Sequence, residues 1–234
     1  MSAAGVTGST TPFQGAGAGS SPSAALHSLQ VRPVPFAAAK ALVERYHYLH
    51  SLPGGTKLAL GVFLDSRLLG AVTFGAGPVN AHCLVKGATA DDCLTLTRLW
   101  LSDELLANAE SRVIGVALRA IRKHTNVKFL LSYADPAQGH VGTIYQATGW
   151  LYTGLSEAMP LYDLGDGVPR HSRSVSHAFG SHSTRHFAAN GVKVKLVSQA
   201  AKYRYIYFLN RSLRSKLNVP VLPYPKKGQP NGSR

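Results

Sequence analysis

The order of the apolar segments limits the folds that this chain can adopt. An amphipathic pattern after Pro35 predicts a helix over residues 36–46. Two apolar runs, 58–64 and 69–75, flank the polar turn 65–68 and predict a β-hairpin. Further along, the pattern predicts a strand over 93–101, a helical region from 102 with clear helical spacing over 111–124, a strand over 127–133, a helix over 143–148, and strands over 150–154 and 202–209. This order predicts an α/β (α+β) domain whose mixed central sheet is flanked by helices.

The composition suggests how the chain divides. Residues 1–28 are mostly Gly, Ala, Ser and Thr without a charged residue, which predicts a disordered leader. We expect a catalytic core over 29–165 and a basic extension over 166–225, with a strand and a helix packed on the core. Residues 226–234, rich in Pro and Gly, are expected to form a flexible tail.

The charge is strongly positive and uneven. The 25 Lys and Arg residues exceed the 11 Asp and Glu residues, for a formal net charge of +14, and most of the excess follows Pro160. A polyanion such as double-stranded DNA is the natural partner, because Lys and Arg bind phosphates and release counterions. A merely solvated basic surface is the alternative. The predicted DNA contacts are Arg170, Arg173, Arg185, Lys202, Arg204, Arg211 and Arg214.

Two cysteines, Cys83 and Cys93, lack the spacing of a zinc site and are expected to be thiols in a reducing cytoplasm. No apolar run is long enough to span a membrane, and the N-terminus lacks the pattern of a secretory signal. The sequence leaves open whether the chain is a monomer or a dimer.

Asp135 stands directly after the predicted strand 127–133 and before Pro136. Active sites of open sheets tend to lie at strand ends, so Asp135 could be a general base or a metal ligand. The structural alternative is a turn-initiating residue, a role in which Asp is common before Pro.

Two stretches resemble the GNAT acyltransferases. I-Y-Q-A-T-G-W, residues 144–150, is similar to the L-Y-x-x-x-G-F-like motif of that family, whose tyrosine often protonates the departing thiolate of coenzyme A. R-V-I-G-V-A, residues 112–117, matches the family's pyrophosphate loop in its minimal form. The resemblance implies a GNAT-like fold and an acyl-CoA-like or other group donor.

A wider set of motifs resembles the phage Mom-type DNA modification proteins. The set comprises Y-H-Y at 46–48, L-T-R-L-W-L at 96–101, E-S-R at 110–112, S-Y-A-D-P at 132–136, G-T-I-Y-Q-A at 142–147, H-S-R-S-V-S at 171–176 and Y-R-Y-I-Y-F at 203–208. The resemblance implies transfer of a methylcarbamoyl (acetamido) group to the exocyclic amino group of adenine in DNA. This modification would protect phage DNA from host restriction enzymes, in the host cytoplasm.

The same resemblance implies roles for individual residues. Asp135, Tyr48 and Tyr145 would be catalytic, and His47, Tyr48 and Asp135 would form a metal set suited to iron. Arg98 and Ser111 would belong to the donor site. The GNAT resemblance adds Arg112 and Gly115 to that site and gives Tyr145 its role as the acid. The structural alternatives are a core-facing aromatic for Tyr48, with His47 favoured at the end of the helix by its dipole. They also include an edge arginine for Arg98, a helix N-cap for Ser111 and a core tyrosine for Tyr145.

The histidines at 171, 177, 182 and 186 are expected to be solvated loop residues, since no cysteine or carboxylate completes a zinc site nearby. Two other functions remain open. One is a GNAT N-acetyltransferase acting on a small amine or a protein lysine, and the other is a non-catalytic nucleic-acid-binding protein.

Overall fold

The computed structural model describes residues 29–228, apart from the side chains of Arg173 and His177. The predicted leader therefore lies outside the described residues, as does most of the predicted tail. No helix within 29–228 is long and apolar enough to cross a membrane.

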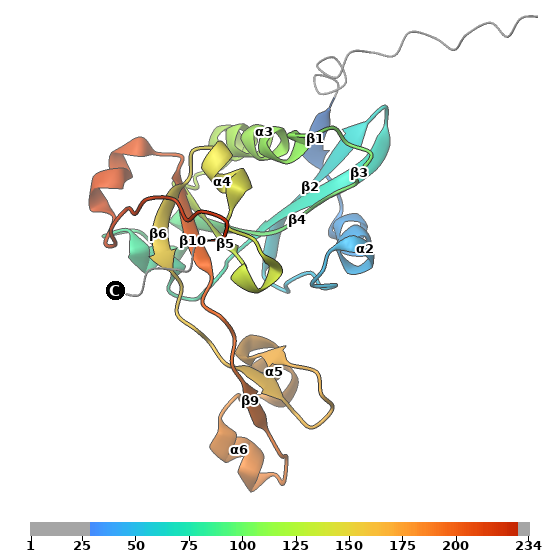
Figure 1. The fold of residues 1–234 in the computed structure, drawn as a ribbon, viewed down its shortest axis with the longest axis vertical. Coiled ribbons are helices and arrows are strands. Elements are labelled where there is room, and N and C mark those ends of the chain that lie inside the picture. Colours follow the sequence, from blue (N-terminus) through green and yellow to red (C-terminus); the bar gives the residue numbers. More distant parts are fainter. Residues whose placement is uncertain (1–28, 229–234) are drawn as a thin grey trace, which may run out of the picture.

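A seven-stranded mixed sheet forms the body of the protein (Figure 1). Its strands, in spatial order, are β1 (Gln30–Pro33), β2 (Thr56–Leu64), β3 (Arg67–Gly75), β4 (Cys93–Leu101), β5 (Phe129–Ala134), β10 (Tyr203–Phe208) and β6 (Leu151–Leu155). Only β4 and β5 are parallel neighbours; the other pairs are antiparallel. The predicted fold class, a mixed sheet with flanking helices, is confirmed.

The hairpin of β2 and β3 forms where the sequence predicts it, and its turn is set by local backbone chemistry. Asp65 and Ser66 both adopt positive φ angles, 49° and 67°. Two successive left-handed residues make the type of two-residue turn whose twist matches that of paired strands. The hairpin therefore closes more tightly than the four-residue turn that the sequence predicts.

Helices cover the two faces of the sheet. Along β2, Leu60 and Val62 point to one face and Ala59 to the other, as the period of two in a strand requires. Helix α3 (Ala109–His124) packs with α4 (Thr143–Ala147) on the first face, and α2 (Phe36–Tyr46) lies on the second. Short 3-10 turns, η1 (Ala81–Leu84) and η4 (Arg211–Lys216), cover the second face beside β5 and β10, while η2 (Ala90–Asp92) precedes β4.

Helix α2 has the predicted bounds, but α3 begins later than predicted. The chain at 102–108 forms turns: the Ser102 N–H still bonds the carbonyl oxygen of Leu69 in β3, and the Leu105 N–H bonds the carbonyl oxygen of Ser102. Asn108 then adopts a left-handed conformation, φ 70°, just before the helix. The prediction of a helix from Ser102 was wrong because these backbone groups are already engaged elsewhere.

A small lobe, residues 161–197, projects from one end of the body (Figure 1). Its three-stranded sheet has the order β8 (Arg170–His171), β7 (Leu161–Asp163), β9 (Lys195–Val197), and two helices, α5 (Ser172–Phe179) and α6 (Thr184–Ala189), pack against it. Tyr162, Val175 and Phe187 form its own buried core. The histidines predicted for a solvated loop are only partly in one: His182 lies in the loop between the two helices, whereas His171 is in β8 and His177 and His186 are in α5 and α6. The side chains of His171, His182 and His186 are exposed, as expected.

Strand β10 lies inside the main sheet, between β5 and β6. The sequence placed this strand in an extension after residue 165. In the structure the chain leaves the sheet after β6, forms the lobe, and returns to the sheet as β10. The insertion is therefore the lobe alone, and the strand after it belongs to the body.

Candidate active site at the ends of β4 and β5

The parallel strands β4 and β5 pair over only three residues and then separate. Cys93–Thr95 pair with Phe129–Leu131, and beyond this point the Ser132 hydroxyl still donates to the Leu96 carbonyl oxygen at 3.3 Å. The carboxyl ends of neighbouring parallel strands bring side chains to one edge of a sheet. This edge holds Arg98 from β4 and Asp135, which directly follows β5.

Asp135 makes two contacts that fix its carboxylate. Its Oδ1 accepts the Ala137 N–H at 3.0 Å, which opens the 3-10 turn η3 (Pro136–Gln138). Its Oδ2 lies 3.1 Å from the Nζ of Lys202, and both side chains are largely buried, 12% and 20% exposed. The turn interpretation of Asp135 is confirmed, but the turn uses only one carboxylate oxygen. The ion pair with Lys202 was not predicted, and no local sequence signal could have revealed it.

His47 caps the C-terminal end of α2 and is buried, whereas Tyr48 is half-exposed. The two rings stack with centroids 4.4 Å apart, and Tyr48 meets the ring of His140 edge-on at 5.9 Å. Burial, together with the neighbouring Arg98, His50 and His140, lowers the pKa of His47 to about 4. His47 is therefore neutral at physiological pH.

The negative charge of Asp135 acts on the phenol of Tyr48. Burial raises the pKa of the Tyr48 phenol, the negative charge of Asp135 raises it further, and Arg98 acts in the opposite direction. The phenol therefore stays protonated and can donate a hydrogen bond. His140 was missed in the sequence, although it follows Asp135 in the same short loop and its N–H bonds the Asp135 carbonyl oxygen at 3.1 Å.

Arg98 joins this edge to the loop after α2. Its Nε donates to the Ser51 carbonyl oxygen at 2.8 Å, and Nη1 donates to that of Thr97 at 2.7 Å. Burial lowers the pKa of its guanidinium. Arg98 pairs with Thr73 of β3 and lies beyond the three residues of β4 that pair with β5, so its position agrees with the interpretation of an edge arginine. A guanidinium has five N–H donors, so Arg98 keeps donors for a ligand beyond these internal bonds.

The geometry does not support the predicted iron set of His47, Tyr48 and Asp135. His47 Nδ1 accepts the Leu49 N–H at 3.1 Å, so the neutral ring carries its proton on Nε2 and has no free lone pair for a metal. Asp135 already pairs with a lysine. Across residues 29–228, no three His, Cys, Asp or Glu side chains gather closely enough to hold a metal ion.

Tyr145 is buried on α4 and packs between Trp150 and Tyr205, with ring centroids 5.3 Å from each. Burial raises the pKa of its phenol to about 12, although a hydrogen bond with Ser132 acts in the opposite direction. Tyr145 is thus a core residue, as the structural alternative states. Its bond to Ser132 also directs the phenol to the place where β4 and β5 separate.

The four residues predicted to bind the donor do not form one loop. Ser111, Arg112 and Gly115 lie within the first two turns of α3, where a phosphate-binding loop was expected. Ser111 is the third residue of the helix and donates to the Asn108 carbonyl oxygen, so its interpretation as the N-cap was wrong. The Nε of Arg112 is buried without a hydrogen-bond partner among the described residues.

The predicted DNA contacts separate into three groups. Arg185 and Arg170 are on the lobe, where Arg170 is ion-paired with Asp166, while the side chain of Arg173 lies outside the description. Lys202 and Arg204 are engaged internally: Arg204 donates to the Thr153 hydroxyl at 3.0 Å and to the Thr153 carbonyl oxygen at 2.8 Å.

The third group, Arg211 and Arg214, is exposed on η4, which follows β10. Strand β10 pairs with β5 from Tyr203 beside Ala134 to Phe208 beside Phe129, so η4 starts at the opposite end from Asp135. The intervening five residue steps correspond to about 17 Å at ~3.4 Å per residue.

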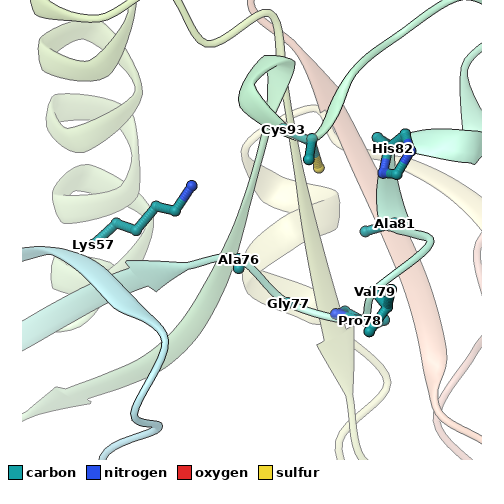
Figure 2. A pocket seen from close by; sticks show the side chains of 9 residues that line it. Lys57, Ala76, Gly77, Pro78, Val79, Ala81, His82 and Cys93 are labelled. Carbon is teal, nitrogen blue, oxygen red and sulfur yellow. The ribbon is translucent and has the colours of Figure 1, made fainter.

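A surface hollow of about 270 Å³ lies at the other end of β4, around Cys93 and His82 (Figure 2). None of the predicted site residues lines it. Burial raises the pKa of the Cys93 thiol to about 12, which keeps the thiol protonated and a poor nucleophile. This hollow is therefore separate from the candidate active site.

Comparison with known proteins assigns the chain to a family. The Mom protein family matches residues 28–226. This chain belongs to the Mom protein family. A relative in Escherichia phage Mu, named methylcarbamoylase mom, is 31% identical over 205 residues, which cover 85% of this chain and 84% of that protein. The Mom-type resemblance predicted from the sequence motifs is confirmed.

Several acetyltransferases of known structure are similar to this Mom family member at low identity. A GNAT-family N-acetyltransferase (YhbS) from Escherichia coli in complex with CoA is 15% identical, with a TM-score of 0.43 over 81% of this chain and 86% of that one. A spermidine N-acetyltransferase from Vibrio cholerae is 7% identical, with a TM-score of 0.44 over 80% of this chain and 99% of that one. These likenesses are too distant to carry an argument about substrate or cofactor.

Proposed function

We propose that the protein transfers a methylcarbamoyl group to the exocyclic amino group of adenine in double-stranded DNA. Membership of the Mom family over nearly the whole chain carries this proposal, with the phage Mu relative named a methylcarbamoylase. The net charge of +14 supports a polyanionic substrate. The modified DNA would resist host restriction enzymes in the host cytoplasm.

The chemistry requires a base. The lone pair of the adenine amino group is delocalised into the ring, so the amine must be held in position and must lose a proton as it attacks. In our proposal the amino nitrogen forms the new bond to carbon, its proton passes to the carboxylate of Asp135, and the leaving group departs with the electrons of the bond that breaks. Tyr145 returns a proton to the leaving group.

The surroundings of Asp135 suit this role. Lys202 and the Ala137 N–H hold the carboxylate in one orientation. Tyr48 is an exposed aromatic ring beside it, with a protonated phenol. An adenine paired inside a duplex must be flipped out to reach a base, and aromatic side chains commonly stack on a flipped base. We propose that Tyr48 holds the adenine by stacking and by a hydrogen bond.

The donor of the transferred group would lie at the start of α3. Arg98, Ser111, Arg112 and Gly115 are the residues proposed to hold it, and the Nε of Arg112, buried without a partner among the described residues, is the observation that favours an anionic or polar ligand there. An acyl-CoA-like molecule fits this chemistry because the first N–H groups of a helix bind phosphate. The donor itself would supply the group that is transferred.

The test is to express the chain beside a plasmid, digest the plasmid DNA to nucleosides and weigh them. We expect a heavier deoxyadenosine with the wild-type chain and none with Asp135→Asn expressed at the same level. Unchanged adenine masses in a host that supports such modification would refute the function. Consumption of acetyl-coenzyme A without DNA would instead favour an ordinary N-acetyltransferase.

A further inference from the structure

The lobe, residues 161–197, is an inserted unit whose stem is tied to the body beside Asp135. The chain enters it after β6 and leaves it at Lys202, just before β10. The two stem segments are tied together where they meet the body: the Ser156 N–H bonds the Lys202 carbonyl oxygen at 2.8 Å, and the Lys202 N–H bonds the Ser156 hydroxyl at 3.0 Å. Since Lys202 also pairs with Asp135, the stem of the lobe and the candidate active site share a residue.

The lobe therefore projects from the edge of the sheet that carries the site. Figure 1 shows it beyond the end of β10 that lies beside the loop after β5. Tyr203, the first residue of β10, pairs with Ala134, the residue before Asp135. A duplex that presents an adenine to Asp135 thus passes beside the lobe.

The lobe has free positive charge on its surface. It contains five Lys or Arg residues and only two acidic residues, Asp163 and Asp166. Both carboxylates are used locally: Asp163 accepts the N–H groups of Gly165 and Gly167, and Asp166 pairs with Arg170.

Three cations among the described side chains of the lobe remain without an ion pair. Arg185 on α6, Lys193, and Lys195 on β9 are all exposed. No ion pair among the described side chains includes any of them. The three residues lie close together in the chain. The Val192 N–H bonds the Phe187 carbonyl oxygen and turns the segment back from α6 to β9.

We propose that the lobe docks on the phosphate backbone of the duplex beside the target adenine, through Arg185, Lys193 and Lys195. This inference rests on the proposed function and identifies the surface that positions its substrate. Of the seven contacts predicted from the sequence, it keeps Arg185, and it adds Lys193 and Lys195. Lys202 and Arg204 are engaged internally, and Arg211 and Arg214 lie at the opposite end of β10. Lysine and arginine contacts to phosphate position a protein on DNA without reading its sequence.

The test compares two triple variants that each remove three exposed cations. The lobe variant carries Arg185→Ala, Lys193→Ala and Lys195→Ala, and the matched control carries Arg211→Ala, Arg214→Ala and Lys216→Ala on η4. Affinity for a fluorescein-labelled duplex is measured over a range of salt concentrations. The rate of adenine modification is measured at several duplex concentrations.

In the lobe variant we expect the slope of log K against log salt to become shallower by up to about 2.7, at ~0.9 for each phosphate that the protein no longer neutralises. The KM for the duplex should rise while kcat stays within about twofold, because the variant weakens ground-state and transition-state binding equally. The control should keep the wild-type slope and KM. Circular dichroism checks that both variants are folded, and the single reversal Arg185→Glu serves if the triple variant is not.

An unchanged slope in a folded lobe variant would overturn the inference, as would equal reductions in the two variants, which would indicate a diffuse effect of net charge. Failure of the proposed function has a different signature: the wild-type chain would leave adenine unmodified whatever its affinity for DNA.

Discussion

The Asp135→Asn variant tests whether the carboxylate of Asp135 is catalytic or only shapes a turn. The amide keeps the size of the side chain, and its oxygen can still accept the Ala137 N–H that Asp135 Oδ1 accepts at 3.0 Å. The change removes the charge that faces Lys202 Nζ at 3.1 Å. Hydrogen bonds to charged groups contribute about 1.5–3 kcal/mol, and Lys202 can regain water because it is 20% exposed. We therefore expect a loss of about 1–2 kcal/mol in the free energy of unfolding.

The expected effect on modification is far larger than this loss of stability. An amide cannot accept the proton from the adenine amine, and loss of a positioned base typically costs ~100- to 10,000-fold in rate. The assay measures the initial rate of deoxyadenosine modification in plasmid DNA by mass, together with duplex affinity and urea unfolding. We expect unchanged affinity, a folded protein and a rate reduced by at least about 100-fold.

Asp92→Asn provides a matched control. Asp92 is 13% exposed, accepts the Thr89 N–H at 3.0 Å and pairs with Lys128 at 2.9 Å, so its contacts are similar to those of Asp135, although Lys128 is more exposed than Lys202. It precedes β4 at the end away from the site. Asp92→Asn should lose similar stability and keep its rate. Near wild-type modification by Asp135→Asn would refute the catalytic role, and bound iron that both Asp135→Asn and His47→Ala lose would instead identify a metal ligand.

Two further predictions concern the neighbours of Asp135. Burial lowers the pKa of His47 to about 4 from 6.5, so the unfolded chain takes up a proton first as the pH falls. Stability that is present above pH 6.5 should then be lost progressively down to pH 4, by about 3 kcal/mol. Urea unfolding at pH 7 and pH 4.5 should show most of this loss, and His47→Gln should reduce it; an equal loss in His47→Gln would refute the assignment. Lys202→Met should lower kcat without changing the salt dependence of duplex binding, and Lys202→Arg should restore part of the rate. A shallower salt slope with unchanged kcat in Lys202→Met would mean that Lys202 is a phosphate contact, as its charge alone suggested.

The sequence by itself determined the elements whose cause is local. The apolar spacing after Pro35 predicted α2 with its observed bounds, and alternation predicted β4 with its observed bounds. Asp135 before Pro136 predicted a turn because an Asx side chain bonds the backbone two residues on, and this is the bond that forms. The motif set also identified the Mom family, since it rests on residue identities and not on their positions in space.

The tertiary structure alone decided which distant segments meet. Strand order depends on how apolar faces and strand edges fit together, so no local pattern in residues 203–208 shows that β10 enters the sheet between β5 and β6. That insertion brings Lys202 to Asp135, places η4 at the far end of β10, and leaves the lobe projecting from the site. The sequence therefore supplied the cations, but only the packing of the sheet decided which of them pair inside the fold and which remain exposed.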